Sequence, residues 1–284
     1  MTIQLIIDGG ADVPKEMMDK YGVLSVALNL HFDDEQLKTD NLDLPTFYDK
    51  LKRSSSLPRS SAPSPYDFYE VYKKVDPEKP ILVLAISGGV SSTYDSAVMG
   101  ADMLLEEEPD RKIKVINTKT ASCGIALLIH EATTRMEEGY EWNQLVTHME
   151  NRAEKVTTLF VLKTLENLIK GGRLDRVKGA IAKTMNIKLI LRASLEEGKI
   201  EVSEKVRGNK KAIRRFIEQV GEYASNLEDQ VIAMSHVNSA ERGRTILNDI
   251  KEKYKFKDSL FVEMGPLIAT YTGESAIVIA FFRD

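Results

Sequence analysis

The chain is poor in the features that mark secreted and membrane proteins. Cys123 is the only cysteine among 284 residues, which excludes internal disulfides and thiolate zinc clusters and fits a reducing cytoplasm. The longest apolar stretches, Pro80–Ile86 and Ala276–Phe282, are far shorter than the ~20 residues that span a bilayer. The first residues lack the basic region that begins a signal peptide, so we expect a cytoplasmic protein.

A surplus of basic residues is also missing. Lys and Arg number 39 and Asp and Glu number 43, which leaves a net charge of −4 at pH 7. Proteins that bind nucleic acid usually carry positive charge against the phosphates, so we expect no nucleic-acid partner. The chain is 43% hydrophobic and 29% charged, which is typical of a globular protein, and its length suits one large domain or two ordinary ones.

Short apolar runs rich in β-branched residues alternate with helical patterns along the chain. Within residues 123–138 and 209–225 the apolar side chains recur on one helical face. Strands that alternate with helices indicate an α/β fold with a mainly parallel sheet. The predicted strands are Ile3–Ile7, Ile81–Ile86, Ile113–Ile116, Leu159–Leu162, Val231–Met234 and Ala276–Phe282.

The middle of the chain has a different pattern. Asn186–Arg192 and Lys199–Lys205 flank a turn that contains Gly198, which predicts an antiparallel hairpin. A hairpin inserted into an α/β chain favours a second α/β domain with a mixed sheet. We place the boundary near Lys155, so the predicted domains are residues 1–155 and 156–284.

The loop Ser87–Thr93 is the most informative segment for function. It joins a buried strand directly to a helix, and it is rich in Gly and Ser. The free N–H groups of a helix start favour an anion, and the hydroxyls add neutral donors. The loop has no Lys and the Walker pattern is absent, which favours a carboxylate or a lone phosphate over a triphosphate. Ser92 and Asp95 also fit a simple helix cap, so a structural role stays open.

The same loop supports an enzymatic alternative. Residues 89–93 resemble the G-x-S-x-G nucleophile elbow with Ser91 as nucleophile, although Thr93 stands where the second Gly belongs. A triad also needs a histidine, and the candidates are His130, His148 and His236. A serine hydrolase is therefore the rival hypothesis.

Two aspartates follow the first predicted strand. Asp8 and Asp12 could bind a metal or start an aspartyl-phosphate mechanism. Spacing supplies no third carboxylate, so we favour structural roles: Asp8 orders its loop through backbone N–H groups, and Asp12 caps the helix that has Pro14 in its first turn. We expect no metal and no cofactor.

Further polar and basic residues stand in short loops. Ser60 and Ser61 lie between prolines in a constrained loop, and Ser64 followed by Pro65 predicts the start of a helix. Arg173 follows two glycines that can end a helix, so we expect it to be exposed. Arg207 begins a basic cluster, which is either a solvated helix face or a docking patch for an acidic partner.

Six segments in chain order resemble the DegV family of bacterial fatty-acid-binding proteins, whose members known as FakB serve a fatty acid kinase. The resemblance covers essentially the full length and rests on the order of the segments rather than on any single motif. The segments are Asp8-Gly9-Gly10 for a TDS turn, Pro58–Ser64 for P-x-T-S-Q-P-S, Ser87–Tyr94 for S-S-G-L-S-G-T-Y, Asn117-Thr118 with Ala121-Ser122, Thr164–Leu168 with Lys170–Arg173, and Gly265–Gly273 for G-P-x-x-x-x-H-T-G.

The resemblance implies two α/β domains with an apolar tunnel between them that holds one long-chain fatty acid. The residues expected at its carboxylate are Ser60, Ser61, Ser91, Ser92 and Tyr271. Arg173 and Arg207 would flank the tunnel mouth and meet a separate fatty acid kinase that forms the acyl phosphate. The chain would then be a carrier and no enzyme, and peripheral or transient contact with a membrane is compatible with that role.

Departures from the family pattern bear on the ligand. Gly9 replaces the serine of the TDS turn, Ser60 replaces a threonine, and Tyr271 replaces the family histidine. A histidine can be cationic near neutral pH, whereas a tyrosine offers a neutral O–H donor. We therefore expect weaker electrostatic stabilisation of the carboxylate and an affinity nearly flat between about pH 6 and 8. A Ser91 esterase and a sensor of a small carboxylate remain the alternatives.

Overall fold

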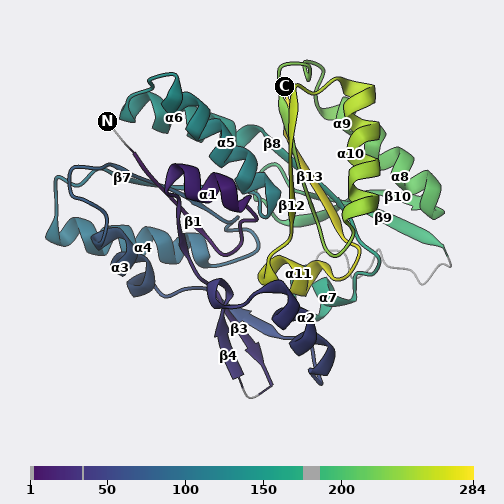
Figure 1. Ribbon diagram of the computed structural model, residues 1–284, viewed down its shortest axis with the longest axis horizontal. Coiled ribbons are helices and arrows are strands. Elements are labelled where there is room, and N and C mark those ends of the chain that lie inside the picture. The colour runs from purple at the N-terminus through teal and green to yellow at the C-terminus, as the bar shows by residue number, and fades with distance from the viewer. Residues whose placement is uncertain (1–2, 34, 175–185) are drawn as a thin grey trace.

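The fold consists of two larger β-sheets with helices between and outside them, and a small third sheet (Figure 1). The structure is a computed structural model that describes residues 3–33, 35–174 and 186–284. In those residues no helix is both long enough and apolar enough to cross a bilayer. The α/β class predicted from the sequence is confirmed.

The first sheet consists of four parallel strands in the order β2–β1–β6–β7. These strands span Leu24–Val26, Gln4–Asp8, Ile81–Ala85 and Ile113–Asn117, respectively. Every residue of β6 is buried, because helices cover both faces of a parallel sheet. On one face Ile6 and Val83 pack against α3 (Pro65–Lys73) and α4 (Thr93–Glu107).

The second sheet is mixed, in the order β10–β9–β8–β13–β11–β12. These strands span Ile200–Arg207, Ile187–Ala193, Val156–Val161, Ile277–Phe282, Val231–His236 and Asp258–Glu263, respectively. Only β11 and β12 pair in parallel, and β9 with β10 forms the predicted antiparallel hairpin. Its outer face packs against α8, α9 and α10, which span Asn209–Glu218, Val220–Tyr223 and Ala240–Tyr254.

Helix α5 (Cys123–Glu137) lies between the two larger sheets, and α6 (Trp142–Lys155) packs against α5 and β7 with much of its surface exposed (Figure 1). α5 contacts β6 of the first sheet and β11 and β13 of the second. The sequence predicted one apolar face for this helix, but all of residues 123–129 are buried, because a helix between two sheets has no solvent side. One hydrophobic cluster therefore continues from the first sheet to the second. The division after Lys155 stays a prediction, and β8 begins there directly after α6.

The third sheet is antiparallel, in the order β4–β3–β5, and was not predicted. Its strands span Glu35–Lys38, Asn29–Phe32 and Arg59–Ser61, respectively. Thr39–Asn41 forms a short 3-10 helix. The remaining α-helices, α1, α2, α7 and α11, span Lys15–Tyr21, Leu44–Arg53, Glu166–Lys170 and Pro266–Thr272. Ser64 caps α3 in a reciprocal capping box with Asp67, and Pro65 is its first residue, as predicted.

Candidate functional site

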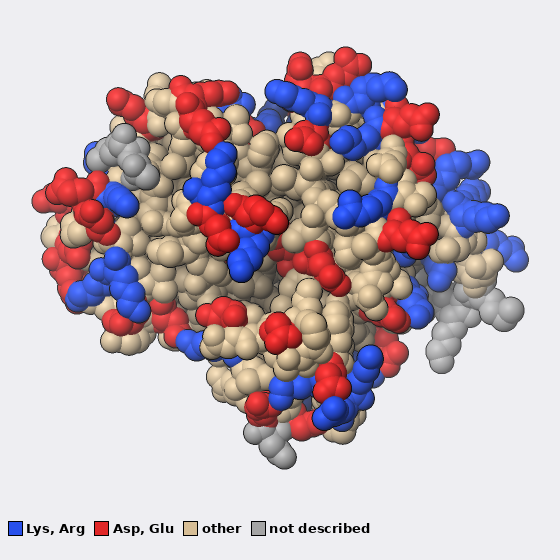
Figure 2. Space-filling view, in the orientation of Figure 1, with Lys and Arg blue, Asp and Glu red and all other residues tan. Residues whose placement is uncertain are grey.

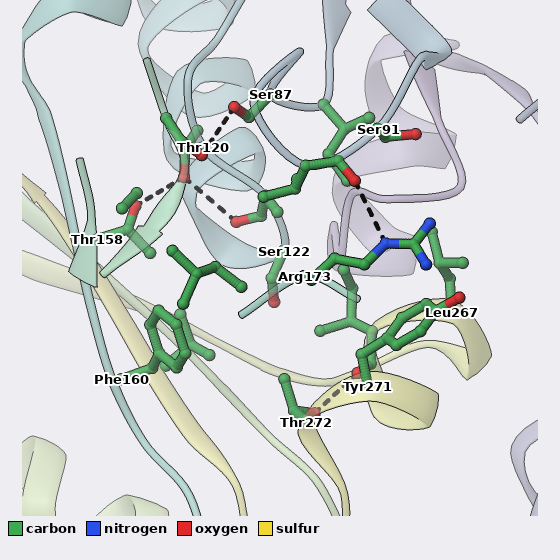
Figure 3. Close-up of a pocket in the computed structure, with 18 of the residues that line it drawn as sticks. Ser87, Ser91, Thr120, Ser122, Thr158, Phe160, Arg173, Leu267, Tyr271 and Thr272 are labelled. Carbon is green, nitrogen blue, oxygen red and sulfur yellow. Dashed lines mark hydrogen bonds between the residues drawn. The ribbon is translucent and has the colours of Figure 1, made fainter. Parts of the chain in front are cut away.

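A cavity that is partly open to solvent lies between the first and second parts of the chain. The first part contributes the loops that follow β6 and β7, at the carboxyl ends of parallel strands. The second part contributes residues of β8, β9, β10, β13 and α11. Apolar side chains such as Phe160, Leu267 and Val278 form much of the wall (Figure 3). The resemblance predicts a tunnel between the two parts, and this cavity lies at that place.

Ser87 and Gly89 join the loop after β6 to the hairpin of the second sheet. Ser87 Oγ donates a hydrogen bond to the Gly198 carbonyl at 2.9 Å, and Gly89 N–H donates to Ser87 Oγ at 3.0 Å. A Cβ on Gly89 would lie 2.2 Å from the carbonyl oxygen of Glu197, so only glycine permits this approach. The Gly/Ser composition of the loop therefore serves the contact between the two sheets as well as any ligand.

Ser91 is the serine of this loop that both lines the cavity and caps α4. Its Oγ lies 2.8 Å from Thr93 Oγ1 and accepts a hydrogen bond from the Thr93 N–H at 3.3 Å. The predicted cap by Ser92 with Asp95 is wrong. Ser92 makes no side-chain cap because its ψ of 5° departs from the extended backbone that a capping residue needs. Ser92 is exposed and is not among the described residues of the cavity wall.

Ser60 and Tyr271 meet at the cavity from opposite parts of the chain. Tyr271 Oη accepts a hydrogen bond from Ser60 N–H at 3.2 Å and lies 2.6 Å from Ser60 Oγ. Side chains alternate along a strand, so Ser61 of β5 points away from this contact. Its exposed hydroxyl lies 3.1 Å from His31 Nε2, and it is not among the described residues of the wall.

Arg173 lies in the cavity wall rather than on an exposed rim, which corrects the expectation from the sequence. Its guanidinium carbon stands 4.7 Å from the centre of the Tyr271 ring, and Nη1 donates to the Gly171 carbonyl at 2.5 Å. Figure 3 shows the side chain between the loop that holds Ser91 and the Tyr271 ring. Among the described residues of the wall, Arg173 alone carries a charge.

Two glycines place Arg173 in this position. Gly172 has a φ of +75°, which turns the chain after α7 in a way that other residues rarely adopt. A Cβ on Gly171 would lie 2.5 Å from Tyr271 Cε1, so the missing side chain makes room for the aromatic ring. The Gly-Gly-Arg sequence was the available signal, and from the sequence alone it predicts a helix end followed by an exposed arginine at the tunnel mouth.

We refer to Ser60, Ser91, Arg173 and Tyr271 as the head-group site. It combines three neutral hydroxyls and one permanent cation and contains no carboxylate. Such a donor set suits an anion with several acceptor oxygens. Other hydroxyls of the wall bond to each other: Thr120 Oγ1 lies 2.7 Å from Thr158 Oγ1. Arg207, at the end of β10, is exposed and lies outside the described part of the wall.

Comparison with protein families matches residues 2–284 to the family described as "Uncharacterised protein, DegV family". The chain belongs to the DegV family. A DegV domain-containing protein of Clostridium perfringens is 30% identical, with 100% of both chains covered. A DegV-family protein of Ruminococcus gnavus, refined with vaccenic acid, is a similar structure with a TM-score of 0.92 and 31% identity over 99% of each chain. The Fatty Acid Kinase (Fak) B3 protein of Streptococcus pneumoniae, loaded with linoleic acid, has a TM-score of 0.88 and 25% identity over 100% of each chain.

In this DegV chain the hydrolase alternative finds no support in the geometry. No histidine is among the described residues that line the cavity, and the described hydrogen bonds of the Ser91 side chain are with Thr93. His148 Nε2 lies instead 2.6 Å from Glu131 Oε1, and His236 Nδ1 accepts from the Ser239 N–H at 3.3 Å. Among the described residues, Ser91 therefore has no hydrogen-bonded general base to activate it.

The two aspartates after β1 have different partners. Asp8 accepts hydrogen bonds from Gly10 N–H at 2.8 Å and Ile86 N–H at 2.7 Å, which confirms its predicted role in ordering the loop. The prediction that Asp12 caps α1 is wrong, because the capping position is Pro14 and Asp12 is turned into the core. The described residues contain no cluster of three or more His, Cys, Asp or Glu side chains that could hold a metal.

Proposed function

We propose that this protein binds one long-chain fatty acid, with its carboxylate at the head-group site and its acyl chain along the apolar walls. The observation that carries the proposal is the placement of one guanidinium and three hydroxyls in an otherwise mainly apolar cavity. A carboxylate accepts strong hydrogen bonds from these donors, while burial of the acyl chain contributes ~0.8 kcal/mol per CH₂ group. Fatty acids in the Ruminococcus and Streptococcus relatives support the same assignment.

We further propose that the bound acid is presented to a separate fatty acid kinase protein. The Streptococcus relative carries the name of such a system, and no histidine among the described residues of the cavity wall could activate Ser91 for chemistry on the bound acid. A basic edge at α8 offers a surface for an acidic partner (Figure 2). Its exposed residues are Arg207, Lys210, Lys211 and Arg214. The protein then acts as a carrier and not as an enzyme, in the cytoplasm, with peripheral or transient membrane contact at most.

The deciding experiment is identification of the small molecule that the purified protein carries. Denaturing mass spectrometry should release one fatty acid per chain, and the delipidated protein should take up oleate with 1:1 stoichiometry in calorimetry. A small polar carboxylate in place of a lipid would favour a sensor. Ester turnover that disappears in Ser91→Ala would establish the hydrolase and overturn the proposal.

A further inference from the structure

Asp12 is a buried carboxylate that connects the first part of the chain to α11. Its side chain is 4% exposed, and Oδ1 accepts a hydrogen bond from Gly265 N–H at 2.7 Å. Its Oδ2 accepts from Ser122 Oγ, which itself lies 2.7 Å from Ser235 Oγ on β11. One carboxylate thus links three segments that are far apart in the sequence. We refer to Asp12, Ser122 and Gly265 as the Asp12 clasp.

The clasp holds a helix that forms part of the cavity. Gly265 is the capping residue of α11, so Asp12 secures the beginning of that helix. Four residues of α11 line the cavity, and Tyr271 near its end bonds Ser60 across the opening. Ser122 lines the cavity as well. α11 is therefore attached to the first part at both ends, by Asp12 and by Tyr271.

Among the described residues, no cation pairs with the Asp12 carboxylate. None of the ion pairs among the described residues involves it, and its hydrogen-bond donors are a hydroxyl and a backbone N–H. The titratable groups that interact electrostatically with Asp12 are the Cys123 thiol of α5 and the Tyr48 phenol of α2, and neither carries a positive charge. Tyr48 also interacts with Glu263 of β12 and Glu274 after α11. The Tyr48 hydroxyl is buried without a hydrogen-bond partner. Burial therefore raises the pKa of Asp12 to about 7.

The sign of the pH effect follows from this environment. In the closed state Asp12 holds its proton up to about pH 7, and the protonated Oδ2 then donates to Ser122 Oγ, whereas a carboxylate that reaches water loses its proton near pH ~4. An opened state with a hydrated Asp12 is therefore disfavoured at low pH and gains population as the pH rises. The population of the opened state rises between about pH 4 and 7. It stays constant above pH 7, because Asp12 is then ionised in both states.

We propose that the Asp12 clasp is a proton-dependent positioning device for α11. Protonated Asp12 keeps α11 and Tyr271 closed over the cavity, and ionised Asp12 releases the helix and with it the bound acid. Asp12 is a positioning residue, since it acts on the ligand through α11. The release of a fatty acid rests on the proposed function, whereas the movement of α11 does not.

Hydrogen exchange of the ligand-free protein tests the clasp without any ligand. After correction for the intrinsic effect of pH, the amides of α11 should open at least about tenfold more at pH 8 than at pH 5. The amides of α4 serve as internal control and should show no such rise. Asp12→Asn should remove the rise in α11. Asp8→Asn is the matched control and should preserve it, because Asp8 is also buried but accepts only from Gly10 and Ile86.

A second variant keeps the test decisive if Asp12→Asn does not fold. The Ser122 hydroxyl lowers the pKa of Asp12. In Ser122→Ala, the pH at which the opening of α11 stops increasing should therefore be higher than in the wild type. The proposal is overturned if this pH is the same in Ser122→Ala and the wild type, or if the opening of α11 does not depend on pH in the wild type. It is also overturned if the pH dependence persists in Asp12→Asn.

The rate of oleate release, measured by stopped flow, tests the clasp and the proposed function independently of each other. We expect faster release at pH 8 than at pH 5 in the wild type and equal rates in Asp12→Asn. If the protein binds no oleate and α11 still opens with the ionisation of Asp12, the proposed function fails and the clasp stands. If oleate binds and its release rate ignores both pH and Asp12→Asn, the clasp fails and the proposed function stands.

Discussion

The two parts of the chain contribute different chemistry to one cavity. The first part supplies loops after parallel strands, which bring small hydroxyl residues such as Ser87 and Ser91 to one edge of a sheet. The second part supplies side chains that stand on strands of a mixed sheet, such as Phe160 and Val278, and these are apolar. In the proposed function, loops therefore recognise the polar head group of the ligand, whereas a sheet face accommodates its acyl chain. Arg173 and Tyr271 depart from this pattern, because the second part adds them to the polar end, and Thr158 of β8 is a polar residue on the sheet itself.

Removal of Arg173 from the polar end of the cavity should weaken oleate binding more than any other single substitution considered below. Arg173→Ala deletes the one charge among the described residues of the wall, and a hydrogen bond to a charged group is worth ~1.5–3 kcal/mol. Oleate affinity should fall roughly tenfold to a hundredfold in calorimetry with delipidated protein. Arg173→Lys should recover part of the loss, because the charge returns without the flat guanidinium over the ring. An unchanged affinity in Arg173→Ala would place the carboxylate elsewhere.

The serines of the first part should show an intermediate effect. Ser60→Ala and Ser91→Ala each remove a hydroxyl that faces the cavity, so oleate affinity should fall by about tenfold in each. Ser61→Ala is the matched control one position along β5, and calorimetry should find its affinity unchanged. Equal losses at Ser60 and Ser61 would contradict the alternation of the strand.

Tyr271 should matter less than the serines and the arginine. Its hydroxyl already bonds Ser60, so Tyr271→Phe should cost about 1 kcal/mol, or roughly fivefold in oleate affinity. Tyr271→His should bind relatively better at pH 6 than at pH 8, since an imidazolium adds a second positive charge beside the carboxylate and a neutral imidazole does not. The oleate affinity of Tyr271→His is divided by that of the wild type at the same pH, which removes the pH dependence that both proteins share through Asp12. A ratio that does not change with pH would show that residue 271 does not face the head group.

Arg207 should have the smallest effect on the ligand. It is exposed at the end of β10, so Arg207→Ala should change oleate affinity by less than about twofold. If the proposed kinase docks on the basic edge, phosphorylation of the bound acid should slow and should become less sensitive to salt. Normal phosphorylation in this variant, measured as acyl phosphate formed per minute, would move the docking surface away from Arg207.

Local rules predicted the features that depend on nearby residues. The hairpin of β9 and β10, the capping box of Ser64 and the loop-ordering role of Asp8 each follow from a few neighbouring side chains. The α/β class followed from the alternation of strands and helices. The family motifs indicated Ser60, Ser91 and Tyr271 as site residues, and the structure brings them to one cavity.

Features that depend on distant partners were missed. β5 is three residues long and exists because it pairs with β3, about thirty residues earlier, and that pairing decides that Ser60 and not Ser61 faces inward. The Tyr271 ring, about a hundred residues later, attracts Arg173 into the wall. Asp12 likewise turns inward to the distant Gly265. None of these contacts leaves a periodic signal near the residue concerned.

The burial of α5 on all sides has a consequence for how the protein is made. Its first two turns are apolar all round and are covered by β11 and β13, which are the last strands to be synthesised apart from β12. A nascent chain that has emerged only as far as Lys155 therefore presents a helix with one uncovered apolar side. Completion of the first sheet on the ribosome cannot bury that side. The two parts must mature together, and the last strand of the chain closes a core that the first strand began.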